Sequence, residues 1–245
     1  MINLRFMAVA TALVATSGVS LAGVVQVQAN PGAPWQRADT SGGGFRATTI
    51  SGFNGVMGGR GGTATSFITF CLERNEQLSG NNAQYNTEIS TSATMGGGGA
   101  IPDGKGGMHD PITAVTATLY REFRFGGTFG GIATAGLDSS SWSTSLTDSL
   151  QLAIWFEEGE LTNSSLMNQF TSDNAAVAMH TWAMNQVANL NLGQYDIGNV
   201  RVLRMFNADG SNSQDLLTII PLPSAAGLAC LGLIAVGGRN RRRAF

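Results

Sequence analysis

Apolar and polar positions alternate residue by residue toward both ends of the central part of the chain, residues 30–218. Residues 66–73, SFITFCLE, alternate in this way and carry β-branched and aromatic side chains, which predicts a half-buried strand; residues 85–89 repeat the pattern more weakly. Two later runs, VRVLRMF and SQDLLTII, flank a turn sequence and predict a β-hairpin. The Gly-, Ser- and Thr-rich stretch 31–65 indicates short strands between glycine turns, or a loose arm.

Between these segments the apolar residues recur every three or four positions, as they do on one face of a helix. The first helix is expected to begin at Asp110 and Pro111, with Asp110 as the N-cap, and to end before Gly126. A second helix is expected at about 147–158, and a third at 174–190. Strands at both ends with helices between them predict an α+β domain.

The first 29 residues show the three-part pattern of a secretory signal peptide. Arg5 precedes the apolar run FMAVATALVATSGVSLAG, and small residues form two candidate cleavage motifs, SLA at 20–22 and VQA at 27–29. An ordinary N-terminal helix is the alternative. We expect residues 1–29 to be a signal peptide and the domain 30–218 to be exported and extracellular.

A second apolar segment lies at the C-terminal end. Residues 222–238 carry no charge and reach the lower length limit of a transmembrane helix. An arginine cluster follows at once, which predicts a cytoplasmic C-terminus and disfavours the alternative of a buried core helix. The cluster consists of Arg239, Arg241, Arg242 and Arg243.

The order of parts at this end resembles the PEP-CTERM sorting signal of Gram-negative and related bacteria. A box with Pro221, Pro223 and Ser224 precedes the apolar helix and the arginines, although Leu222 stands where the family more often has Glu. The resemblance covers residues 219–245 and implies that an exosortase-type processing enzyme cuts near the box. It further implies an inner-membrane-anchored precursor, transiently associated with the membrane, that ends at the cell surface or on extracellular polysaccharide, as in a biofilm matrix.

The charge balance argues against one class of partner. Residues 30–218 contain eight Arg and one Lys against sixteen acidic residues, about −7 in all. Nucleic-acid binding calls for clustered basic side chains that face phosphates, so we expect no nucleic-acid partner. The glycine-rich stretch 95–111 lacks the flanking strand and the Lys-Ser/Thr ending of a phosphate-binding loop.

The cysteine count raises a question of chemistry. Cys230 lies in the C-terminal apolar segment, which leaves Cys71 as the only thiol of an exported domain. Three interpretations stay open at this point: an inert buried side chain, an intermolecular disulfide, or a reactive group.

Three short motifs, FCLE at 70–73, ATLY at 117–120 and LQLAIW at 150–155, resemble the thioester domains of bacterial surface adhesins. FCLE at 70–73 matches the Cys on an early strand, and LQLAIW at 150–155 matches a Thr-Gln-x-Ala-type motif on a helix, with Leu150 in place of Thr. The resemblance spans about residues 66–160 and implies a thioester-domain-like core. The matching residues are Cys71, Gln151, Ala153, Ile154 and Trp155.

The resemblance implies a defined reaction. The Cys71 thiolate would attack the side-chain carbonyl of Gln151, ammonia would leave, and the internal thioester would acylate an amine or hydroxyl of a partner. Backbone N–H groups at the start of the 147–158 helix are expected to stabilise the oxyanion. Lys105 is the only lysine of the domain, so self-quenching amines are scarce, although an Arg-biased composition explains this equally well. The structural alternative is an inert Cys71 and a Gln151 that bonds its own helix.

Other chemistry has little support in the sequence. His109 and His180 lack the ligand spacing of a metal site, and no nucleophile-elbow motif is present, so we expect no metal and no cofactor. Glu157, Glu158 and Glu160 are expected to form a solvated face rather than paired glycosidase carboxylates. The expected function is therefore a non-enzymatic, exosortase-processed surface or matrix protein that adheres through a Cys71–Gln151 thioester. The alternative is a secreted polysaccharide-acting hydrolase with the same sorting tail.

Overall fold

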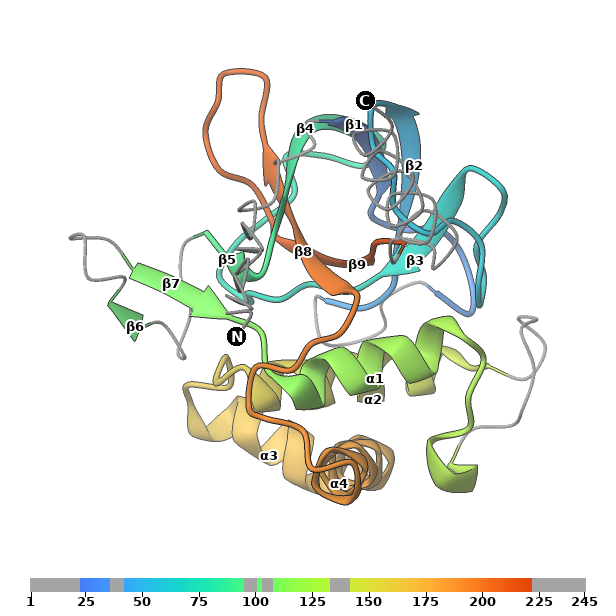
Figure 1. Cartoon of the computed structure of the whole chain (residues 1–245), viewed down its shortest axis with the longest axis vertical. Coiled ribbons are helices and arrows are strands. Elements are labelled where there is room, and N and C mark those ends of the chain that lie inside the picture. The colour runs from blue at the N-terminus through green and yellow to red at the C-terminus, as the bar shows by residue number, and fades with distance from the viewer. Residues whose placement is uncertain (1–22, 36–41, 95–100, 103–107, 133–141, 222–245) are drawn as a thin grey trace, which may run out of the picture.

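Six antiparallel strands form the larger sheet, in the order β3-β2-β1-β4-β8-β9, and three short strands form a second sheet, β5-β7-β6 (Figure 1). The computed structural model describes residues 23–35, 42–94, 101–102, 108–132 and 142–221. The strands are β1 (Gly23–Gln28), β2 (Phe45–Ser51), β3 (Ser66–Thr69), β4 (Ala83–Ser90), β5 (Ser92–Ala93), β6 (Ile101–Pro102), β7 (Met108–Pro111), β8 (Val200–Phe206) and β9 (Leu216–Ile219).

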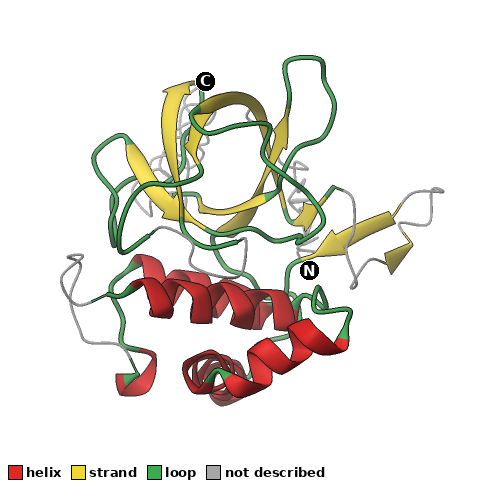
Figure 2. Ribbon diagram, turned by 180° about the vertical axis from the view of Figure 1, so that it is seen from behind, coloured by secondary structure: helices red, strands yellow, loops and turns green. Residues whose placement is uncertain are grey.

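The larger sheet curls into a barrel-like ring, which both ribbon views show (Figures 1 and 2). The segment that follows β3 meets β9 and closes the ring: Cys71 forms a β-bridge with Leu216, and the Leu217 N–H donates to the Phe70 carbonyl at 3.2 Å. The Leu72 N–H donates to the Asp215 carbonyl at 3.1 Å. Closure pairs the two edges of the sheet and places Cys71 at the seam.

Strand β1 lies inside the sheet and pairs with both β2 and β4. Its residues alternate between buried and half-buried, with Val25 and Val27 fully buried. These residues fall within the expected signal peptide, 1–29. A cut after Ala22 leaves β1 whole, whereas a cut after Ala29 removes a strand that joins two others.

Four α-helices pack on one side of the barrel in the described part of the chain (Figure 2). Strands at both ends of the domain with a helical middle confirm the predicted α+β class, and β8 and β9 confirm the predicted hairpin. The additional helix α3 was not predicted. The helices are α1 (Ala114–Arg124), α2 (Thr144–Glu157), α3 (Ser164–Ser172) and α4 (Asn174–Asn189), with a 3-10 turn η1 (Phe129–Gly131).

Three helix starts differ from the prediction, and one of them is that of α2, which begins at Thr144, three residues before the expected position. Asp110 and Pro111 belong to β7, and Thr113 is the N-cap of α1, where its hydroxyl accepts the Thr116 N–H at 3.1 Å. The sequence predicts Asn174 as the N-cap of α4, but the N-cap is Asp173, one residue earlier, and Asn174 is the first helical residue. A threonine or aspartate oxygen at the N-cap satisfies an N–H group that the helix leaves without a partner.

Buried contacts hold the helices against the barrel seam. The Tyr120 hydroxyl of α1 donates to the Ile68 carbonyl of β3 at 3.1 Å. The Thr147 hydroxyl of α2 donates to the Pro34 carbonyl at 2.8 Å, and the Phe123 ring packs edge-on against Phe70 at 5.0 Å between centroids. These contacts hold α1 against β3 and the segment that follows it, and α2 against the segment that precedes β2.

No helix in the described ranges is long and apolar enough to cross a membrane. The expected transmembrane segment 222–238 lies outside the described residues, as do Pro223, Ser224 and the arginine cluster. Pro221 is the last described residue, two positions after β9 ends.

Candidate functional site

The structure brings Cys71 and Gln151 together at the barrel seam. Gln151 lies in the middle of α2 and is fully buried, and Cys71 is 2% exposed. The Gln151 Nε2 donates to the Cys71 carbonyl at 2.9 Å, and the Cys71 N–H donates to Gln151 Oε1 at 3.1 Å. The side-chain amide thus pairs with the backbone of Cys71 as a strand would, and this places its carbonyl carbon beside the thiol residue.

The Gln151 carbonyl oxygen accepts two backbone N–H groups. The second donor is Gly43, at 3.2 Å, from the segment before β2. Two donors on one carbonyl oxygen form the arrangement that stabilises an oxyanion when a nucleophile attacks the carbon. The sequence predicted donors from the first turn of the helix; the donors instead come from Cys71 and Gly43, because Gln151 points out of α2 toward the seam.

The glycine run 42–44 allows this close approach. A Cβ at Gly42 would lie 2.5 Å from the Trp155 ring and 2.8 Å from Gln151 Cγ, and one at Gly44 would lie 2.8 Å from the Trp35 carbonyl. Gly43 has φ +121°, which favours glycine. Sequence reasoning missed the role of this run, although SGGGF before a strand was its visible trace.

The other residues of the helical motif are core residues on α2. Ala153 and Ile154 are fully buried, and Trp155 is 2% exposed. Trp155 lies one turn after Gln151 and covers it from the side of Gly42, while its indole Nε1 has no hydrogen-bond partner among the described residues. This packing shields the carboxamide from water, which strengthens hydrogen bonds to its oxygen.

A cavity of about 780 Å³ connects the seam with the surface, and we refer to it as the Cys71 cavity. Cys71, Trp155 and Gln214 contribute to its buried part, and Arg74 and Glu76 line it closer to solvent. Cys71 is therefore a buried residue that lines a space a small ligand can enter. The remaining lining residues are Ala29, Asn30, Phe45, Asn75, Gln77, Leu78, Gly80 and Asn81.

Carboxyl groups next to this cavity are partly or fully buried and accept hydrogen bonds from the backbone around it. Glu76 accepts the Asp215 N–H at 3.1 Å, and the Glu160 carboxylate accepts the Arg74 N–H at 3.0 Å. Burial, with a further contribution from the charge of Asp215, raises the pKa of Glu76 to about 7. Burial also raises the pKa of Asp215 to about 6. Protonation of such groups in the neutral range is a recurrent property of functional sites.

The prediction that Glu157, Glu158 and Glu160 form a solvated face is wrong. Glu158 and Glu160 are each 5% exposed, and Glu157 pairs with His180 of α4 at 2.7 Å. Glu158 accepts the Thr113 N–H at 3.3 Å, and its burial raises its pKa to about 8. The three residues lie at and just after the C-terminal end of α2, and their side chains bond to neighbouring segments. Their clustering in sequence therefore reflects packing.

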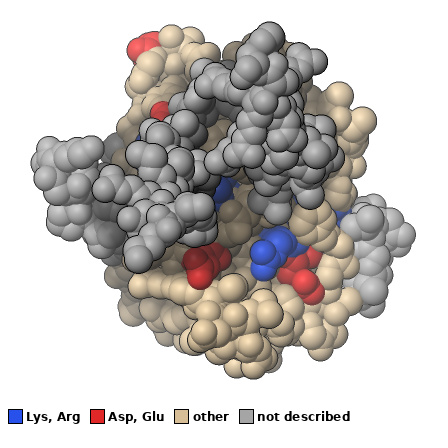
Figure 3. Space-filling view, viewed as in Figure 1, with Lys and Arg blue, Asp and Glu red and all other residues tan. Residues whose placement is uncertain are grey.

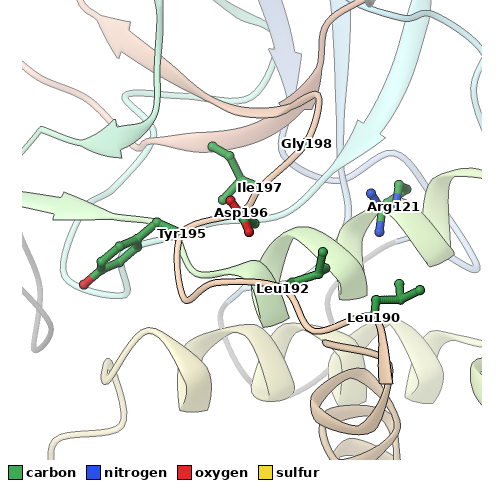
Figure 4. A pocket seen from close by; sticks show the side chains of 7 residues that line it. All are labelled: Arg121, Leu190, Leu192, Tyr195, Asp196, Ile197 and Gly198. Carbon is green, nitrogen blue, oxygen red and sulfur yellow. The ribbon is translucent and has the colours of Figure 1, made fainter. Parts of the chain in front are cut away.

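A second, shallower cavity of about 470 Å³ lies between α1 and the loop that precedes β8, and we refer to it as the Arg121 cavity. Figure 4 shows Arg121 on α1 opposite Asp196, with Tyr195 turned outward and Leu190 at the end of α4. The face in Figure 3 shows small groups of acidic and basic side chains near one another. The described residues that line this cavity include no cysteine, and their side chains offer contact surface rather than a nucleophile.

Among the described residues no group of three or more His, Cys, Asp and Glu side chains is placed to hold a metal ion. Compared with models of known protein families, with curated proteins and with solved structures, the chain matches none of them.

Proposed function

We propose that this protein is an exported surface or matrix protein that forms an internal thioester between Cys71 and Gln151 and uses it for covalent attachment. The observation that supports this most is the position of the Gln151 carbonyl, which accepts the N–H groups of Cys71 and Gly43. Together with the bond from Gln151 Nε2 to the Cys71 carbonyl, these contacts hold the carboxamide against the backbone of Cys71 with its oxygen paired to two donors.

The chemistry follows from these contacts. The Cys71 Sγ adds to Gln151 Cδ, and the charge that develops on Oε1 is stabilised by the two N–H groups. The C–N bond then breaks, the thiol proton passes to the departing nitrogen, and ammonia leaves. The product is an acyl thioester beside a cavity, ready to transfer the acyl group to a nucleophile from outside.

The fold is compatible with a thioester-domain-like core. The barrel seam supplies the cysteine just after an early strand, and the buried helix α2 supplies the glutamine. The protein acts once by this route and is not an enzyme in our proposal.

Export and sorting complete the proposal. We propose that the signal peptide is cut after Ala22, because this leaves β1 intact between β2 and β4. An exosortase-type enzyme then cuts near Pro221, just beyond β9, and releases a folded domain from its membrane anchor to the cell envelope or to extracellular polysaccharide.

Intact mass spectrometry tests the cross-link. The wild-type domain is expected to be lighter than its sequence by about 17 Da, the mass of ammonia. Cys71→Ala and Gln151→Ala are expected to abolish the loss, whereas Gln169→Ala, on the exposed side of α3, is a matched control that retains it. An unchanged wild-type mass, together with sugar released from exopolysaccharide, supports the hydrolase instead.

Sorting is tested separately in cells. In a strain without the exosortase the chain is expected to accumulate at full length in the membrane fraction. N-terminal sequencing of the processed protein is expected to begin at Gly23. A cytosolic product with an intact N-terminus contradicts export.

A further inference from the structure

Five of the thirteen described residues that line the Cys71 cavity carry a side-chain amide. Four of them, Asn30, Asn75, Gln77 and Asn81, are exposed, and Gln214 is 4% exposed. A carboxamide both donates and accepts hydrogen bonds, as does a hydroxyl group. An ammonium group only donates, so it would use the amide carbonyls of the wall but not their N–H groups.

The charges of the cavity wall are balanced. Among the described residues of the wall, Arg74 and Glu76 are the only charged ones, and they carry opposite signs when both are ionised. A wall of this kind selects neither a strong cation nor a strong anion. The occupant that fits amides, a balanced charge and the apolar side chains of Phe45 and Trp155 is a neutral saccharide.

Glu76 is placed to move a proton near the thiol. Its Oε2 accepts the Asp215 N–H, and the Asp215 carbonyl accepts the Leu72 N–H, so only Asp215, the residue before β9, lies between this carboxyl and the backbone next to Cys71. Glu76 and Cys71 line the same cavity. A pKa of about 7 gives this carboxyl a sizeable ionised fraction at neutral pH without making it a poor base.

We propose that the Cys71 cavity binds a neutral saccharide and that Glu76 accepts the proton of the saccharide hydroxyl that takes the acyl group. The hydroxyl oxygen attacks Gln151 Cδ while its proton passes to the Glu76 carboxylate. The C–S bond breaks, the Cys71 thiolate takes the proton from Glu76, and an ester to the sugar remains. The acyl-transfer step rests on the proposed thioester; the saccharide site itself does not.

The binding site is tested in the Cys71→Ala variant, which cannot form the cross-link. Maltohexaose, cellohexaose and mannohexaose are titrated into the labelled protein and followed by NMR. At least one is expected to bind at millimolar concentration or tighter and to shift signals of cavity residues. Asn75→Ala with Gln77→Ala is expected to weaken binding at least about fivefold, whereas Asn168→Ala, on the exposed face of α3, leaves it unchanged.

Absence of binding by all three sugars, or equal binding by the double variant, overturns the saccharide site. Binding supports it even if the wild-type protein never loses ammonia, so failure of the cross-link and failure of the site are distinguishable.

The proton-transfer role is tested in protein that has lost ammonia. The sugar that binds is expected to add its full mass as a hydroxylamine-labile ester, and Glu76→Gln is expected to slow this at least about tenfold. Methylamine attacks as the neutral amine and needs no protein base to remove a proton first. The rate of its addition is therefore expected to change less than about twofold in Glu76→Gln. Equal slowing of both probes, or of neither, overturns the role of Glu76.

Discussion

The two cavities of this protein differ in what lies behind their walls. Behind the Cys71 cavity, a thiol, a carboxamide and buried carboxyl groups converge from β-seam, helix and loop. The Arg121 cavity is formed by side chains of α1 and the loop before β8, most of them exposed. The presence of a cavity therefore does not by itself indicate a reactive site. Buried polar groups that converge from distant segments, each with a defined partner, mark the site.

We expect the largest effect on stability from a substitution of the Gln151 carboxamide itself. In the Cys71→Ala background, where no cross-link can form, Gln151→Glu is expected to destabilise the fold by about 3 kcal/mol. The carboxylate cannot donate to the Cys71 carbonyl, and a buried charge would result. Urea unfolding measures the change. Gln169→Glu on α3 serves as control and is expected to shift stability by less than about 0.5 kcal/mol.

We expect the next largest effect on stability from a substitution of Gly42, which lies against Gln151 and Trp155. Gly42→Ala is expected to destabilise by about 2 kcal/mol and to lower the yield of cross-linked protein, because its Cβ would overlap the Trp155 ring. Gly80 lies on the wall of the same cavity, and a Cβ added there would meet open space. Gly80→Ala is expected to leave both stability and cross-link yield unchanged, and equal effects at the two glycines would contradict the proposed fit.

Buried Glu158 gives a smaller, pH-dependent effect. Because burial raises its pKa from 4.5 to about 8, its protonated form favours folding fully below about pH 4.5, and this contribution is lost as the pH rises through about 8. Glu158→Gln is expected to be more stable than wild type by about 1 kcal/mol at about pH 8.5. Chemical unfolding at a series of pH values between about 5 and 8.5 measures the slope.

Glu76 and Asp215 have raised pKa values too, so part of the fall in stability with pH is expected to persist in that variant. Glu88→Gln on β4 is the control for a substitution away from these groups. A pH profile of Glu158→Gln identical to that of wild type would show that Glu158 does not contribute.

The Arg121 cavity is expected to give the smallest effect. Arg121→Ala removes its basic group but touches neither Cys71 nor Gln151. The loss of about 17 Da is expected to stay complete, and stability is expected to change by about 0.5 kcal/mol or less. Mass spectrometry and thermal unfolding check both, and a reduced mass loss would show that the two cavities are coupled.

Short-range patterns predicted much of the fold. The alternation in SFITFCLE and the three-to-four spacing around Gln151 identified the strand and helix that meet at the seam. Helix α3 was missed because only Leu166 and Phe170 of its nine residues are buried, too few for a clear period. Strand β1 was missed because GVVQVQ directly follows the apolar run of the expected signal peptide. Its alternation was therefore not distinguished from that run.

Of the residues around the candidate site, the sequence predicted Cys71 and Gln151, which the structure brings into contact. Gly43 and Glu76 could not be found, because they reach Gln151 and the cavity through the closure of the barrel, which joins segments far apart in sequence. The burial of Glu158 and Glu160 was missed for the same reason: a charged cluster in sequence carries no information about which segments cover it.

The most direct measurement is peptide mapping of the wild-type protein. Trypsin releases Cys71 in the peptide 61–74 and Gln151 in the peptide 125–201. We expect one species that contains both peptides and weighs about 17 Da less than their sum, and we expect hydroxylamine to convert it to the separate peptides. Two unlinked peptides, with a free thiol on the first and an intact glutamine in the second, would contradict the proposed cross-link.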